Sequence, residues 1–222
     1  RQVMNRFNPN PRLLLFILAL LVLLAVVHVG VISITFSKLG LTRESAFVLL
    51  FCSLLGSMIN LPLFTIKLST PIKLRDVPMS RMLRPYIQSG RTLIAVNVGG
   101  CLIPVLFSVY LFSIQPLMPY QILIGIGLVT VISYTFSFPV PGTGIGMPMI
   151  VAPVCAAIIA IMLNSELSAP LAYISGTMGV LIGADLLNFR HVSKMGALVA
   201  SIGGAGTFDG IFMTGILAVL LA

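Results

Sequence analysis

The feature that most constrains this chain is a long run without any charged residue, from Thr92 to Ser165. Such a run cannot cover the surface of a water-soluble domain, because soluble domains carry roughly a quarter charged residues. The whole chain has the same character, since only 8% of its 222 residues are charged and 58% are hydrophobic. We therefore predict an integral membrane protein. Soluble enzymes, disordered proteins and nucleic-acid-binding proteins are poor interpretations, despite the net charge of +8.

Charged residues and proline-rich breaks divide the chain into segments that match the bilayer, which needs about 20 apolar residues per helix. This spacing predicts an all-α polytopic bundle of about seven transmembrane helices, with residues 1–222 forming a single integral membrane domain. The expected spans are Leu13–Phe36, a segment between Glu44 and Ile66, Thr92–Ile114, Tyr120–Phe138, Gly144–Leu163, Pro170–Phe189 and Met195–Ala222.

The basic residues orient these spans. With a cytoplasmic N-terminus, only Lys38 and Arg43 of the 13 Lys and Arg residues fall outside, which agrees with the positive-inside rule. We expect a multi-pass protein of the cell membrane. Six basic residues gather in the predicted cytoplasmic loop 67–91, where they favour contact with anionic lipids of the cytoplasmic leaflet. A docking platform for an acidic partner is the alternative.

Glycine and proline interrupt the predicted helices near residues 139–153 and 203–210. A pair of broken apolar segments is typical of secondary transporters, in which the ends of half-helices face a solute or an ion. Asn60-Leu-Pro62 is interpreted as a helix kink. Candidate residues for a cavity or an ion pathway are His28, Asn60, Asn97, Gly142, Gly144 and Gly146.

Two aspartates, Asp185 and Asp209, lie inside apolar sequence. An ionisable residue in a bilayer costs at least about 2.5–3.5 kcal/mol, so its presence points to function. Two neighbouring carboxyl groups that share a proton supply one acid and one base, the arrangement by which aspartic proteases activate water. We therefore predict a catalytic pair. The supporting residues are Gly203, Gly204, Gly206, Gly210 and Asn188.

The segment from Gly206 to Leu217, Gly-Thr-Phe-Asp-Gly-Ile-Phe-Met-Thr-Gly-Ile-Leu, resembles the GxGD helix of presenilin-type intramembrane aspartyl proteases. Ala184-Asp185-Leu186 is similar to the Tyr-Asp motif on the preceding helix of that family. The resemblance implies that Asp185 and Asp209 are the catalytic pair, although Ala184 and Phe208 depart from the motifs. The whole chain also resembles small prokaryotic multi-pass membrane proteins of unknown function.

Two functions remain open. The first is a GxGD-like intramembrane protease, or a degenerate relative, that acts on a membrane-helix substrate. The second is a proton- or cation-coupled transporter of a small solute. On straight helices the two carboxyl groups would lie roughly 15 Å apart, so the pair requires a break in the last helix at its glycines. We expect no metal, no cofactor and no nucleic-acid partner, and a homo-oligomer is compatible with the small-residue spacings Gly179-x-x-x-Gly183 and Gly206-x-x-x-Gly210.

Overall fold

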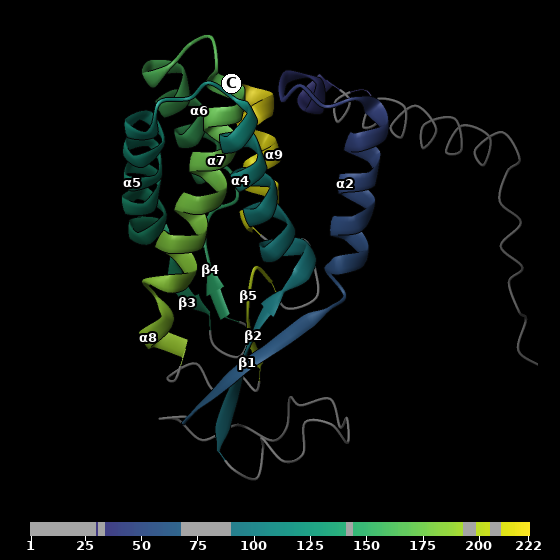
Figure 1. Ribbon diagram of the computed structural model, residues 1–222. Coiled ribbons are helices and arrows are strands. Elements are labelled where there is room, and N and C mark those ends of the chain that lie inside the picture. The colour runs from purple at the N-terminus through teal and green to yellow at the C-terminus, as the bar shows by residue number, and fades with distance from the viewer. Residues whose placement is uncertain (1–29, 31–33, 68–89, 141–143, 193–198, 205–209) are drawn as a thin grey trace, which may run out of the picture.

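The computed structural model describes residues 30, 34–67, 90–140, 144–192, 199–204 and 210–222 (Figure 1). This part of the chain is mostly helical, as predicted, but it also contains β-strands. The helical elements are α2 (Arg43–Gly56), η2 (Val98–Leu102), α4 (Ile103–Ile114), α5 (Pro119–Phe136), α6 (Val151–Leu163), α7 (Ser168–Val180), η3 (Leu181–Leu186), α8 (Phe189–Val192) and α9 (Gly210–Leu221). The strands are β1 (Asn60–Lys67), β2 (Arg91–Asn97), β3 (Phe138–Val140), β4 (Gly144–Gly146) and β5 (Val199–Ile202).

Successive long helices run in alternating directions, so their connections gather at two opposite ends of the molecule (Figure 1). At one end, Lys38 Nζ donates hydrogen bonds to the carbonyl oxygens of Val219 and Leu220, at 3.4 and 3.3 Å. Ser168 Oγ donates to the carbonyl oxygen of Ala222 at the same end, at 3.2 Å. These contacts tie the approach to α2 and the start of α7 to the last turn of α9. The strands and α8 lie at the other end.

Helix α7 is the centre of the packing. It contacts α4, α5, α6 and α9, and it lies among them in Figure 1. Nearly all of its side chains are buried, including Tyr173, whose ring meets that of Phe107 edge-on with the centroids 5.0 Å apart. Small residues allow this close approach, as small residues do between membrane helices. At Gly215 of α9, for example, an added Cβ would lie 2.9 Å from the Tyr173 ring.

The outer helices expose apolar side chains. Helix α5 turns Leu123, Val131 and Tyr134 outward, and α2 exposes Phe47 and Phe51. Two of the described helical segments are long and apolar enough to cross a membrane: the 18 residues of α5, and the 19 residues of α7 together with η3. The first is 28% buried and the second 78% buried, which fits a peripheral and a central helix.

A three-stranded sheet corrects the all-α prediction. Strand β1 pairs antiparallel with β2, and β2 pairs in parallel with β5. Asn60 lies opposite Asn97 at one end of the first pair, and Lys67 lies opposite Arg91 at the other. Pro62, which was expected to kink a helix, lies instead in β1, where the register shifts. Strands β3 and β4 form a separate antiparallel hairpin.

Four of the predicted spans are therefore wrong as continuous helices. The second is helical only to Gly56, and the third begins as the strand Arg91–Asn97. The fifth is helical only from Val151, and the seventh contains the strand Val199–Ile202 before α9. The physical reason is that hydropathy detects an apolar run but not its backbone conformation, and a short run rich in Ile, Val and Thr is also favourable in a strand.

The other spans have different outcomes. The fourth and the sixth coincide with α5 and with α7 plus η3, which are the two long apolar helices. Most of the first span, and residues 68–89 of the basic loop, lie outside the described residues. The expected breaks are present: the β3–β4 hairpin precedes α6, and Gly203 and Gly204 follow β5 with positive φ angles of 81° and 109°.

The Gly183 contact offers a test of the α5–η3 packing. An added Cβ at Gly183 would overlap the carbonyl oxygen of Thr130 and lie 3.0 Å from the backbone nitrogen of Tyr134, neither of which can move freely. We expect Gly183→Ala to lower the stability of the protein by about 1–3 kcal/mol, the usual cost of overpacking. Thermal unfolding in detergent measures the change. The control is Gly127→Ala on the exposed face of α5, where no described atom lies within 4 Å; equal melting temperatures for the two variants would contradict the contact.

Candidate polar junction

Five of the predicted site residues lie where the three-stranded sheet joins the helices. We call this place the polar junction and define it by Ser57, Asn60, Asn97, Gly100, Asp185, Ser201 and Gly203. Strand β2 leads through η2 into α4, and strand β5 leads into the glycine turn before α9. Because β2 and β5 are parallel, their carboxyl ends lie at the same edge of the sheet. The junction is therefore built from two strand–glycine–helix units side by side.

Asn97 is the hub of the hydrogen bonds in the polar junction. Its side chain is 0% exposed. Its Nδ2 donates to the carbonyl oxygen of Ser57 at 2.7 Å and to Oδ1 of Asn60 at 3.1 Å, and its Oδ1 accepts from the backbone N–H of Gly100 at 2.7 Å. Ser201 Oγ donates to the same Asn60 oxygen at 2.6 Å. Strands β1, β2 and β5 are thus joined through side chains as well as through the ladder.

Glycines let the backbones of η2, α2 and the turn after β5 touch directly. An added Cβ at Gly99 would overlap the carbonyl oxygen of Ser53, and one at Gly100 would overlap the carbonyl oxygen of Gly203. An added Cβ at Gly203 would lie 2.5 Å from Cβ of Cys101. Gly203 also has a φ angle of 81°, which side-chain-bearing residues rarely adopt. The close approach of Gly100 to Gly203 therefore requires glycine at both positions.

Asp185 lies on the π-helical segment η3, and its Oδ2 accepts a hydrogen bond from the backbone N–H of Gly203 at 3.2 Å. The wider π-helical turn is visible in the bond from the Leu187 N–H to the carbonyl oxygen of Ile182, at 2.9 Å. Such π-helical turns are rare in proteins, and those that occur are often found at functional sites. Asn188 Nδ2 donates to the carbonyl oxygen of Gly183 at 3.1 Å and so supports the same turn. Asp185 is thereby held against the glycine turn that follows β5.

An apolar cluster surrounds the Asp185 side of the junction. It contains Cys101 of η2, Leu181 and Ala184 of η3, and Ile211 of α9, which is 0% exposed. Ala184 is the chain neighbour of Asp185, and Ile211 follows Gly210 at the start of α9. The first turn of α9 and η3 therefore contribute to the same buried cluster, and α9 contacts η2.

The structure brings together five of the residues singled out from the sequence: Asp185, Asn60, Asn97, Gly203 and, next to it in the turn, Gly204. Others take separate places. Asn188 supports η3, Gly210 begins α9, and Gly144 and Gly146 belong to strand β4, which contacts η3. The remaining candidates lie outside the described residues, and these are His28, Gly142, Gly206 and Asp209.

Sequence reasoning missed Gly99, Gly100, Ser57 and Ser201. A signal for the first two is present, because the dipeptide Gly-Gly occurs at residues 99–100 and again at 203–204, each time after an apolar run. Ser57 enters through its backbone carbonyl, which no side-chain pattern marks. No group of three or more His, Cys, Asp or Glu side chains that could hold a metal lies among the described residues.

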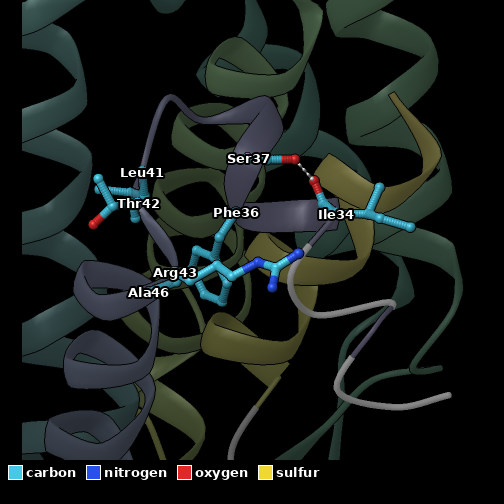
Figure 2. Close-up of a pocket in the computed structure, with 7 residues that line it drawn as sticks. All are labelled: Ile34, Phe36, Ser37, Leu41, Thr42, Arg43 and Ala46. Atoms are coloured by element: carbon cyan, nitrogen blue, oxygen red, sulfur yellow. Dashed lines mark hydrogen bonds between the residues drawn. The ribbon is translucent and has the colours of Figure 1, made fainter. Parts of the chain in front are cut away.

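A separate pocket of about 150 Å³ lies at the opposite end of α2 (Figure 2). Figure 2 shows Ser37 Oγ donating to the carbonyl oxygen of Ile34, at 2.8 Å. Helix α2 extends over about 20 Å between this pocket and Ser57, at 1.5 Å per residue, so the pocket is remote from the polar junction. Its lining consists of Ile34, Phe36, Ser37, Leu41, Thr42, Arg43 and Ala46.

The fold and the junction define a mostly helical protein in which two parallel strands are each followed by a glycine pair, beside a buried amide and a carboxylate. The chain belongs to the family described as a protein of unknown function (DUF1614), whose model matches residues 54–221. This range contains every residue of the polar junction. The prediction of a family of unknown function is thus confirmed, and the match gives no separate support to the presenilin-type resemblance. No curated protein and no solved structure matches the chain.

Gly203 and Gly210, which lie on either side of residues 205–209, give a paired test of the turn. Gly203→Ala combines a positive φ with a close contact to Cys101, so we expect it to lower the free energy of unfolding by about 1–3 kcal/mol. Gly210→Ala has neither problem, since no described atom lies within 4 Å of an added Cβ. Chemical or thermal unfolding in detergent compares the two. Equal loss in both variants would contradict the turn geometry.

Proposed function

We propose that this protein is an intramembrane aspartyl protease in which Asp185 and Asp209 form the acid–base pair. One observation carries the proposal: the segment before Asp209 contacts Asp185, and the segment after it packs in the same buried cluster as the Asp185 turn. On one side Gly203 donates its N–H to Asp185 Oδ2. On the other side Ile211, two residues beyond Asp209, packs in the same buried cluster as Ala184.

The course of the chain before α9 also supports the proposal, because straight helices would hold the two carboxyl groups roughly 15 Å apart. The carboxyl groups could not meet if residues 195–222 formed one regular helix. Instead, β5 ends at Ile202, the chain turns at Gly203 and Gly204, and α9 begins at Gly210. The break that a pair requires is therefore present at the expected glycines. The GxGD-like sequence from Gly206 to Leu217 supports the same assignment.

The chemistry needs one carboxylate and one carboxylic acid. The carboxylate removes a proton from water as the water oxygen attacks the substrate carbonyl carbon, and the carboxylic acid donates its proton to the carbonyl oxygen. The tetrahedral intermediate then breaks at its C–N bond: the newly protonated carboxyl group gives its proton to the leaving amine, and the other carboxylate takes a proton from a hydroxyl group of the intermediate, which restores the pair. The N–H of Gly203 fixes one oxygen of Asp185, which restricts how that carboxyl group can rotate.

Membrane placement is part of the proposal, and two observations support it. The outer faces of α2, α4 and α5 expose apolar side chains. The ends of the molecule also differ in charge: Lys67, Arg91 and Arg190 lie at the sheet end, whereas Lys38 and Arg43 lie at the other. With the sheet end cytoplasmic, this distribution follows the positive-inside rule and favours contact of the sheet end with anionic lipids. A membrane helix is then the natural substrate.

Removal of either carboxylate should abolish cleavage. We expect Asp185→Asn and Asp209→Asn each to lower kcat by a factor of about 10² or more, because acid–base catalysis typically contributes about 10²–10⁴. The assay uses proteoliposomes that contain the full chain and a single-span peptide with a fluorophore and a quencher on either side of its helix. Glu166→Gln, in the connection between α6 and α7, is the matched control and should cleave like the wild type.

A cross-linking experiment tests the pair without a substrate. In a background in which Cys52, Cys101 and Cys155 are replaced by Ala, Asp185→Cys combined with Asp209→Cys should form a disulfide on mild oxidation. That bond requires Cβ atoms about 3.5–4.5 Å apart. Asp185→Cys combined with Met162→Cys, at the far end of α6, should not form one. Failure of the 185–209 cysteine pair to form a disulfide would contradict the proposed pairing of Asp185 with Asp209.

A coupled transporter is the second candidate function. It is favoured by the two parallel strand–glycine–helix units, because interrupted helices beside a carboxylate are typical of ion and solute sites. In that case Asp185 would bind a proton or a cation beside Asn60 and Asn97. Uptake of ²²Na⁺ into proteoliposomes, lost in Asp185→Asn and unaccompanied by peptide cleavage, would favour this function over the protease.

A further inference from the structure

We propose that Asn97 is a positioning residue for Asp185, acting through the backbones of Gly100 and Gly203. The inference rests on the proposed function, because it assigns Asn97 a role in the same site. Asn97 has no direct hydrogen bond to Asp185 among those of the polar junction. Its influence passes through three contacts in series, from the amide to Gly100, from Gly100 to Gly203, and from Gly203 to the carboxylate.

The first contact fixes Gly100. Asn97 caps η2, with its Oδ1 accepting from the Gly100 N–H at 2.7 Å. The amide cannot rotate away, because its Nδ2 is bound to the carbonyl oxygen of Ser57 and to Asn60 Oδ1. An amide is the side chain of this size that accepts through one atom and donates twice through another. Aspartate would keep the acceptor but lose both donors.

The second contact passes the position of Gly100 to Gly203. The two backbones are so close that an added Cβ at Gly100 would overlap the carbonyl oxygen of Gly203. No flexible side chain separates them, so a shift of η2 must move the Gly203 turn. Gly203 also lies against Cys101, the next residue of η2, and so has contacts with two consecutive residues of that turn.

The third contact reaches the carboxylate. The N–H of Gly203 donates to Asp185 Oδ2 at 3.2 Å. A shift of the turn lengthens this bond, and hydrogen bonds weaken steeply as their geometry degrades. Catalytic groups lose rate when displaced by as little as about 1 Å, so a small movement of the turn has a large effect on chemistry. Asn97 therefore contributes to the orientation of Asp185 through η2 and the Gly203 turn.

The test compares Asn97→Ala with a chemically matched control, Asn164→Ala. Asn164 Oδ1 also accepts from the backbone N–H three residues later, that of Leu167, at 3.0 Å, but at the opposite end of the molecule. The measurements are hydrogen exchange at the Gly203 amide in the full-length protein in detergent, and kcat and KM for the single-span peptide. Exchange reports the contact directly and does not depend on activity.

We expect Asn97→Ala to accelerate exchange at Gly203 and to lower kcat, each by about tenfold, while KM stays unchanged; tenfold corresponds to about 1.4 kcal/mol, near the worth of one hydrogen bond. Asn164→Ala should leave all three values unchanged. Asn97→Ser, which keeps an oxygen able to cap η2, should fall between the wild type and Asn97→Ala, and it carries the test where the alanine variant does not fold.

Unchanged Gly203 exchange in both Asn97 variants overturns the positioning role, as does an equal acceleration in Asn164→Ala. These outcomes are distinct from failure of the proposed function. A wild-type protein that cleaves no peptide and forms no 185–209 disulfide overturns the protease, whereas faster Gly203 exchange in Asn97→Ala still supports the link from Asn97 to the Asp185 contact.

Discussion

The structure depends on how backbone N–H and C=O groups are satisfied where helices break inside apolar surroundings. Gly100 and Gly203 are buried, so a backbone N–H at either position needs a partner within the protein. At the polar junction each of these two glycines has a polar side chain as its partner. The Gly100 N–H binds Asn97, the Gly203 N–H binds Asp185, and glycine at both positions allows the approach. The side chains of Asn97 and Asp185 therefore stabilise the fold, whatever part they play in a reaction.

Hydropathy was sufficient to predict the helices that are apolar along their whole length. Helices α5 and α7 are long apolar runs bounded by prolines and polar connections, and the sequence predicted both. It could not distinguish strand from helix in Leu93-Ile-Ala-Val96 or Val199-Ala-Ser-Ile202, because each run is short, apolar and compatible with either backbone. The decision came from pairing between segments about one hundred residues apart, which local sequence does not contain.

The candidate site was predictable where chemistry is carried by side chains. An aspartate or an asparagine in apolar sequence is conspicuous because burial is costly unless it is bonded, and this singled out Asp185, Asn60 and Asn97. The rest of the site is backbone. The carbonyl of Ser57 and the close approach of Gly100 to Gly203 arise from the crossing of η2 and the turn after β5, so they could be recognised only once the segments were placed together.

The contacts of α9 restrict how this protein can move. Its last turn is held by Lys38 and Ser168, which come from two different connections, and its first turn is held by the buried side chains of Ile211 and Phe212. A helix fastened at both ends cannot slide along its axis like a piston without breaking one set of contacts.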